Sequence, residues 1–195
     1  MQVLIPGNSN LANWNFTLTQ NFRWGKIQNT ALTHEHTSTT RVRAYCQSEK
    51  FRNERQIKQR ADRKQISEME RWWFQRLVST PRPLEEKLTL FWHGHFATGY
   101  RGTENSYHMY LQNMFFRQNA MGNFKEDLVR GIIHDPAMIR YLNNNQNRKQ
   151  APNENLAREL MELFTLGEGE GYTEDDIKEG ARSLTGYTLE DDEFA

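Results

Sequence analysis

Two short motifs in this chain carry side chains that could do chemistry. The first is His93-Gly94-His95, and the second is the pair Glu159 and Glu162. Imidazole and carboxylate ligands together suit zinc, manganese or iron, and two carboxylates in different environments can act as acid and base. We therefore take Glu159, Glu162 and His95 as candidate catalytic residues. The candidate ligands of a divalent metal ion are His93, His95, Glu159 and Glu162.

Each motif also has a structural interpretation. On a continuous helix the two histidines point about 200° apart, so they could converge on one ion only if the helix ended at Gly94. Otherwise His95 is a hydrogen-bonded core histidine and His93 lies at the rim. Glu159 and Glu162 could form interhelical salt bridges, because structural ion-pair networks use the same residue types. The candidate partners are Arg140, Arg148 and Arg182.

The carboxylates belong to a helix predicted for residues 152–167. Asn153 is a good N-cap, and Gly167 stands where a left-handed residue ends a helix. Apolar residues recur at helical spacing and predict one buried face. They are Leu156, Leu160, Leu163 and Phe164.

Polar residues of this helix fall on both sides of the apolar face. Asn155, Glu159 and Glu162 lie along one border at about 100° per residue. Glu154 and Arg158 form an i, i+4 pair on the other side. This ridge of two carboxylates and an amide could form one wall of a polar centre.

The remaining elements also read as helices with short loops. Helical periods and stop signals predict helices at 44–79, 83–96, 104–121, 124–134, 136–142 and 173–185. In the helix from residue 83, the predicted buried face is apolar. It consists of Leu84, Leu88, Phe91, Trp92 and His95. The class is therefore all-α, an array of about six helices, whereas residues 1–43 show no sustained period and predict an irregular or poorly ordered segment.

Composition narrows the possible functions. The only cysteine, Cys46, excludes an internal disulfide and a thiolate zinc site. No apolar run has the length of a membrane span or of a signal-peptide core, so the chain as written would be cytoplasmic. Net charge is zero, but residues 41–76 contain eleven Lys/Arg and five Asp/Glu, while residues 151–195 contain three and thirteen. Solvated helix faces explain such asymmetry more often than a nucleic-acid arm, so nucleic acid is not our expected partner.

Three segments stand out together, in this order along the chain. They are RPLEEKLTLFWHGHFAT from Arg82, DPAMIRYLNNNQNRKQAPNENLARELMELFTLGEG from Asp135 and YTEDDIKEGARSLTGYT from Tyr172. This arrangement resembles the bacterial domain of unknown function 1800, over about residues 72–194. The sequences of the three segments are similar to those of planctomycete-type members. Nothing comparable precedes about Ala44.

The resemblance implies a largely helical protein of several hundred residues, often exported and frequently encoded beside a second uncharacterised secreted family, which would be its partner. It implies no established activity. The positions that match the family's most characteristic polar motifs are His93, His95, Asn153, Glu154, Asn155, Arg158, Glu159 and Glu162. They support a shared polar centre between the two motif-bearing helices.

The chain departs from that family in three ways. It has no export signal, it lacks the leucine, arginine and Phe-Gly block usual near the start, and it stops where the family continues. We therefore expect a fragment, in which residues 44–195 form the N-terminal portion of a longer domain. A shifted reading frame or a truncated gene would explain residues 1–43.

The main hypothesis is an all-α protein of that family with a His/Glu polar or metal centre, whose enzymatic nature is open. The first alternative is a non-catalytic helical scaffold or interaction module of a secreted or envelope assembly, with the same polar residues fixing helix register. The second alternative is nucleic-acid binding through the basic helix at residues 41–76.

Overall fold

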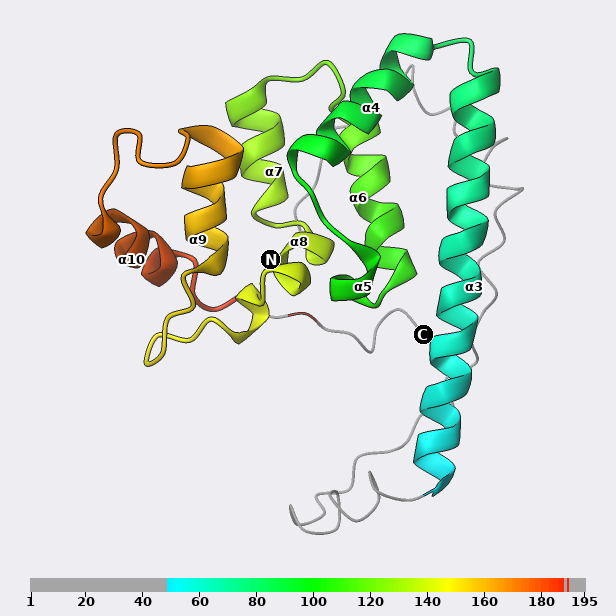
Figure 1. The fold of residues 1–195 in the computed structure, drawn as a ribbon, viewed down its shortest axis with the longest axis horizontal. Coiled ribbons are helices and arrows are strands. Elements are labelled where there is room, and N and C mark those ends of the chain that lie inside the picture. Colours follow the sequence, from blue (N-terminus) through cyan, green and yellow to red (C-terminus); the bar gives the residue numbers. More distant parts are fainter. Residues whose placement is uncertain (1–48, 188, 190–195) are drawn as a thin grey trace, which may run out of the picture. The chain divides into compact units, whose positions relative to one another are not determined.

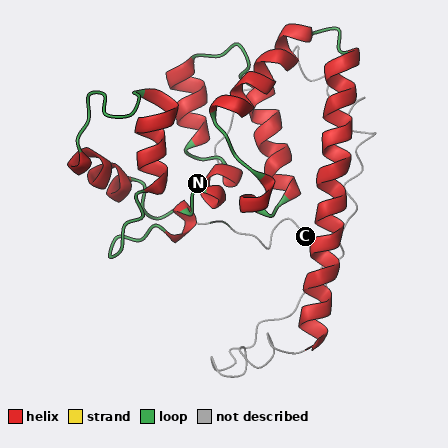
Figure 2. Cartoon of the chain, in the orientation of Figure 1, coloured by secondary structure: helices red, strands yellow, loops and turns green. Residues whose placement is uncertain are grey.

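Helices make up all the regular secondary structure in the part of the chain that the computed structural model describes, residues 49–187 and 189 (Figure 2). The predicted all-α class is confirmed. The segment 1–43, with its predicted boundary, lies outside the described residues. The order of the helices is α3 (Glu49–Ser79), α4 (Pro83–His95), α5 (Tyr100–Thr103), α6 (Ser106–Gln118), η1 (Phe124–Val129), α7 (Arg130–Ile132), α8 (Pro136–Tyr141), η2 (Asn144–Gln146), α9 (Asn155–Glu159), η3 (Leu160–Thr165) and α10 (Glu174–Ser183) (Figure 1).

The long helix α3 packs against the fold only in its second half. Ile66 and Met69 are buried, and the helix contacts α4 and α6. Residues 52–60 are exposed at every position. The first turns stay solvated because they carry charges where a docking face would need apolar side chains.

Helix α4 buries a different face from the one predicted. Glu86 and Thr89 are its buried residues, whereas Leu84 is 57% exposed and Phe91 56% exposed. The prediction from apolar spacing was wrong for Leu84 and Phe91, whereas Leu88, Trp92 and His95 of the same predicted face are partly buried. The Glu86 side is buried because α6 and α3 offer it charged and polar partners. A paired polar face can be buried where an unpaired one cannot.

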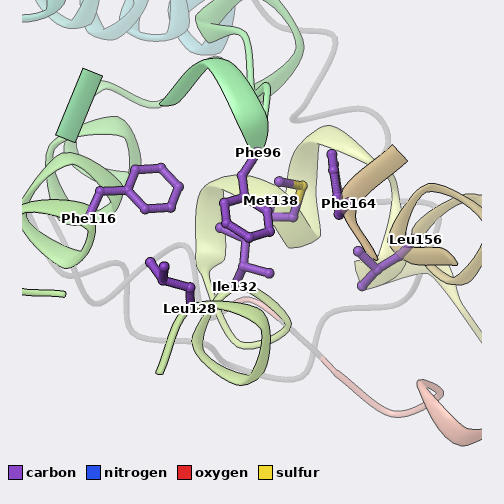
Figure 3. Packing of buried hydrophobic residues seen from close by; sticks show 7 residues of the cluster. All are labelled: Phe96, Phe116, Leu128, Ile132, Met138, Leu156 and Phe164. Atoms are coloured by element: carbon purple, nitrogen blue, oxygen red, sulfur yellow. The ribbon is translucent and has the colours of Figure 1, made fainter. Parts of the chain in front are cut away.

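The core gathers around the end of α4. Figure 3 shows seven buried side chains that meet there from successive elements. They are Phe96, Phe116, Leu128, Ile132, Met138, Leu156 and Phe164. Full burial of one such side chain stabilises a fold by about 1.5–3 kcal/mol, so this cluster holds together the helices that carry the predicted polar motifs.

Two of the predicted helices contain π-helical turns. The predicted helix at 124–134 is the π-helix η1 followed by α7, and the predicted helix at 152–167 is α9 followed by the π-helix η3. In η3 the amide of Leu166 donates to the carbonyl of Met161 at 2.9 Å, one residue further than in an α-helix. The wider turn rotates the residues, and Leu163, predicted to be in the core, is 64% exposed.

Capping signals located several helix ends correctly. Thr173, where the last predicted helix begins, forms a capping box with Asp176, with hydrogen bonds of 3.3 and 2.8 Å between them. Gly167 has the predicted left-handed conformation, with φ of 106°. At the start of η1, Asn123 Oδ1 accepts from the amide of Glu126, and the amide of Asn123 donates to the carboxylate of Asp127.

Candidate polar centre

The two motif histidines lie on opposite sides of α4, which continues through His95. The ring of His93 lies between Trp73 of α3 and Phe116 of α6, with centroid distances of 4.8 and 4.7 Å. Its Nε2 is 3.1 Å from the side-chain nitrogen of Asn113. Burial lowers the pKa of His93 to about 4, and the positive charge of Arg117 is the second cause of this lowering. His93 is therefore a neutral ring at neutral pH.

The ring of His95 lies on the side of α4 that contacts η3. Its Nε2 is 2.9 Å from the carbonyl oxygen of Phe164, and its ring centroid is 5.6 Å from that of Phe124. An imidazole N–H that donates to this carbonyl connects the two motif-bearing segments directly. The divergence of the histidines agrees with the angular argument from sequence.

The carboxylate of Glu162 pairs with an arginine of its own helical segment rather than with a histidine. Arg158 Nη1 donates to Glu162 Oε1 at 2.9 Å, and Arg158 Nη2 donates to Glu154 Oε2 at 3.3 Å. The same guanidinium makes bonds of 3.1 and 2.7 Å to Glu174 of α10. These carboxylates, Glu174 first, raise the pKa of Arg158. The Glu154–Arg158 pair is confirmed, whereas the suggested partners of Glu162, namely Arg140, Arg148 and Arg182, were wrong.

Glu159 differs from Glu162. It is half-buried, and its carboxylate makes no hydrogen bond or ion pair within residues 49–187. Over the same residues, no three His, Cys, Asp or Glu side chains lie close enough together to hold a metal ion. The structure thus brings His95 to the backbone of η3 without gathering the four predicted ligands, His93, His95, Glu159 and Glu162, around one point.

The asparagines before α9 hold the loop that leads into it. Asn153 Oδ1 accepts from the amide of Asn155 at 3.0 Å, so it caps the helix start as predicted, although α9 begins two residues later. The amide of Asn153 donates to Asn147 Oδ1 at 2.9 Å. Asn147, which is buried, also donates to the carbonyl of Ala181 in α10 and to Asn144 Oδ1. This network connects the loop to the last helix.

A second polar centre, which sequence reasoning did not find, lies between α3, α4 and α6. Glu86 is 1% exposed, and its oxygens accept hydrogen bonds from Arg117 at 2.6 and 2.9 Å, from Trp73 Nε1 at 3.0 Å, and from Arg76. Burial alone would raise the pKa of Glu86, but the two guanidinium groups outweigh it and hold that pKa below its ordinary value. The guanidinium of Arg117 also lies 5.2 Å from the ring of Trp72.

The spacing of this second centre was visible in the sequence. Glu86, Thr89 and His93 recur at intervals of three and four, and Asn113 and Arg117 are four apart. Such periodic polar residues can indicate a buried polar interface between helices.

A third buried polar group lies at the start of α8. Asp135 Oδ2 accepts from the amide of Met138 and from Gln112 Nε2, both at 2.8 Å. Gln112 Nε2 also donates to Thr98 Oγ1 at 3.0 Å. Burial raises the pKa of Asp135 to about 7, against the lowering effect of the hydrogen bonds from Met138, Gln112 and Ala137. This carboxyl group therefore changes its charge close to neutral pH.

Comparison with known proteins identifies one family. A family model described as "Protein of unknown function (DUF1800)" matches residues 12–195. The match therefore extends well before residue 72, where the resemblance was expected to begin, and the expectation that nothing comparable precedes about Ala44 was wrong. No curated protein and no solved structure matches the chain. Within the part of the chain that the structure describes, no helix is both long and apolar enough to cross a membrane.

Proposed function

The chain belongs to the DUF1800 family, and from that premise we propose that it is a non-catalytic helical interaction module. Its charged and polar residues fix the positions of the helices. Its exposed apolar side chains are available to a protein partner. The side chains of the His/Glu motifs are among those that fix the positions of the helices.

The observation that carries this proposal is the burial of Glu86 between two arginines. Its partners Arg76 and Arg117 come from α3 and α6, so one carboxylate joins three helices. A buried ion pair contributes little net stability compared with apolar packing, but a helix register that breaks the pair leaves an uncompensated charge. Such a group selects one packing arrangement.

The family motifs support the same role. His95 binds a backbone carbonyl of η3, and Arg158 joins Glu154 and Glu162 to α10 through Glu174. The bonds of His95 to Phe164 and of Arg158 to Glu174 join elements that are separate in the sequence, whereas Glu154 and Glu162 lie four residues from Arg158 on either side. They account for His95 and Glu162 without a metal ion or a substrate.

The surface of α3 and α4 supports the partner. Several large apolar side chains of these helices are more than half exposed. They are Phe74, Val78, Leu84, Leu90 and Phe91. Large exposed apolar side chains are the kind of surface that a contact with another protein buries. A secreted protein encoded nearby, which the family resemblance suggests, is the partner that we propose.

Metal analysis tests this proposal against a His/Glu metal centre. The purified full chain, His95→Ala and Glu159→Ala would be dialysed against a divalent metal mixture and analysed by mass spectrometry, with Glu168→Ala as an exposed control. We expect the same substoichiometric metal content in all four proteins. One metal ion per chain in the parent and in Glu168→Ala, lost from both other variants, would contradict the interaction module and establish the metal centre.

A further inference from the structure

Helix α4 carries polar residues on its buried side and apolar residues on its exposed side. Glu86 and Thr89 are buried, whereas Leu84, Leu90 and Phe91 are each more than half exposed. A surface helix of a globular protein normally has the reverse arrangement. The exposed side of α4 therefore has the composition of a contact surface.

This exposed side also carries one charge that the fold leaves without a partner. At about 100° per residue, Lys87 lies between the directions of Leu90 and Phe91. Its ammonium group makes no hydrogen bond or ion pair within residues 49–187. A Cβ at Gly94, two turns further along, would meet no atom within 4 Å. We call Leu84, Lys87, Leu90 and Phe91 the outer face of α4, and a surface complementary to it offers apolar side chains beside a carboxylate.

The segment formed by α9 and η3 has a surface of this complementary kind. Leu163 and Leu166 are more than half exposed. Glu159 lies four residues before Leu163, which places both on the same side of the helical segment. Its carboxylate makes no hydrogen bond or ion pair in the part of the chain that the structure describes. We call Glu159, Leu163 and Leu166 the acidic face of η3.

The neighbouring charges strengthen the negative sign of this face. Glu154, Glu162 and Glu174 share a single guanidinium, that of Arg158. Glu159 adds a fourth carboxylate beside that one arginine. The outer face of α4 and the acidic face of η3 therefore have opposite charges, and both surround these charges with exposed apolar side chains.

The two faces meet within one chain. His95, which follows Gly94, has its Nε2 2.9 Å from the carbonyl oxygen of Phe164, which follows Leu163. A twofold axis near this junction brings the outer face of α4 in each copy onto the acidic face of η3 in the other, so that both contacts form at once. Antiparallel packing of α4 on a second α4 would instead leave the two Lys87 residues about 6 Å apart along the helix axis.

We propose that two copies of this chain form a closed pair, in which the outer face of α4 in each copy packs on the acidic face of η3 in the other and Lys87 lies opposite Glu159. This pairing goes beyond the proposed interaction module. It uses the α4 part of the exposed apolar surface and leaves Phe74 and Val78 of α3 to the secreted partner. The apolar side chains supply most of the affinity, and the charges select the orientation.

Sedimentation equilibrium of the full chain, over about 1 to 100 μM, tests the pairing. The parent chain should show twice the mass of one chain. Lys87→Glu and Glu159→Lys should each raise the dissociation constant at least about tenfold, because each places like charges opposite one another. An equimolar mixture of these two variants should restore the pairing, since every contact in a mixed pair again joins a carboxylate and an ammonium group. A mixture that stays monomeric would overturn the proposal.

The charge controls are Lys149→Glu and Glu70→Lys, which reverse exposed charges away from both faces. Both should keep the dissociation constant of the parent chain within about threefold. The apolar contact is tested by Phe91→Ala, which should weaken the pairing at least about tenfold, against Phe74→Ala, which should not. An equal loss in a variant and its control would contradict the assigned faces.

Circular dichroism should show equal helix content in all variants. If Phe91→Ala loses helix, Leu90→Gln replaces it, because Leu90 lies on the same face. A parent chain with the mass of one copy over the whole range would overturn the pairing, and so would a mass above two copies, which indicates open head-to-tail association. Neither result contradicts the interaction module, whose own test is the metal analysis.

Discussion

Glu86 and Arg117 form a bidentate ion pair between α4 and α6 that is almost completely buried. The guanidinium donates through Nε to one carboxylate oxygen at 2.6 Å and through Nη2 to the other at 2.9 Å. The exposed fractions of the two residues are 1% and 7%. Because the pair is buried and bidentate, its geometry depends on the exact placement of both helices.

Replacement of Glu86 by Gln should destabilise the fold strongly. The variant leaves Arg117 and Arg76 without a counter-charge, so we expect a loss of about 3–5 kcal/mol in the free energy of unfolding. Urea denaturation at pH 7.5 measures it. The neighbouring Glu85→Gln serves as control and should lose about 1 kcal/mol or less, since its pairs with Arg76 and Arg82 lie nearer solvent. Equal losses would contradict the buried pair.

Glu86 should also make the fold sensitive to acid. Its pKa is lowered in the folded state, so its contribution to stability is present above the unfolded pKa near 4.5 and is lost as the pH falls through the folded value. The parent chain should therefore lose this stabilisation below pH 4.5, and Glu86→Gln should not. Urea denaturation of both proteins at pH 3.5 and pH 5.5 measures the difference. Parallel losses in the two proteins would assign the acid sensitivity to other groups.

Asp135 should make stability fall as pH rises. Its pKa is about 7 in the fold and 3.8 in the reference state, so the folded protein holds the proton more tightly. Its contribution to the free energy of unfolding is fully present below pH 4 and is lost as the pH rises from there through 7. Asp135→Asn keeps a side chain that can cap α8 and carries no charge. The free energy of unfolding of this variant, relative to that of the parent chain, should be larger at pH 8 than at pH 5. At roughly 1.4 kcal/mol per pKa unit, the expected difference is a few kcal/mol.

The measurement for Asp135 is the free energy of unfolding at pH 5 and pH 8. Asp176→Asn is the control for a capping carboxylate at the surface. The pKa of Asp176 is lowered by hydrogen bonds from Thr173, so this replacement should show no gain at pH 8. An unchanged pH profile in Asp135→Asn would show that Asp135 is already ionised well below neutral pH.

His93 should make stability fall as the pH decreases, which is the opposite of the effect of Asp135. Its pKa is lowered from 6.5 to about 4, so the unfolded chain takes up the proton first, and stability falls as the pH decreases through this window. Between pH 7.5 and pH 5 the loss should be about 2 kcal/mol. His93→Gln should remove this loss and leave the opposing effect of Asp135. A nuclear magnetic resonance titration that finds the His93 ring charged at pH 5.5 would contradict the prediction.

A pair of glycine replacements tests the packing of α7 on α6. A Cβ at Gly131 would overlap the ring of Phe115, whereas a Cβ at Gly94 would meet no atom within 4 Å. Gly131→Ala should therefore cost about 1–3 kcal/mol through overpacking. Gly94→Ala should gain up to about 1 kcal/mol from helix propensity. Thermal denaturation of both variants measures the contrast, and a stable Gly131→Ala protein would show that Phe115 can move aside.

Local signals determined most helix ends correctly. Pro83 and the left-handed Gly167 lie where the sequence predicted them, and Thr173 caps the helix that was predicted to begin there. These signals depend on residues within one turn of each other, so a single sequence contains all the information they need.

Long-range partners decided which face of each helix is buried. Apolar spacing alone predicted the Leu84 and Phe91 side of α4, but Arg117, more than twenty residues further along, brought the Glu86 side into the interior. The π-turn in η3 similarly turned Leu163 outwards. Neither effect follows from local spacing, because each depends on what packs opposite.

The sequence by itself determined the all-α class, the family, the helix ends and the divergence of His93 from His95, since all of these follow from local periodicity or from recognisable motifs. Only the tertiary structure decided that His95 binds the backbone beside Phe164 and that Arg158 holds Glu162. It also decided that Glu86, at 1% exposed, is the most buried charged residue in the part of the chain that the structure describes. The physical reason is that desolvation and pairing energies depend on which groups lie opposite in space, and helix spacing describes only one side of each contact.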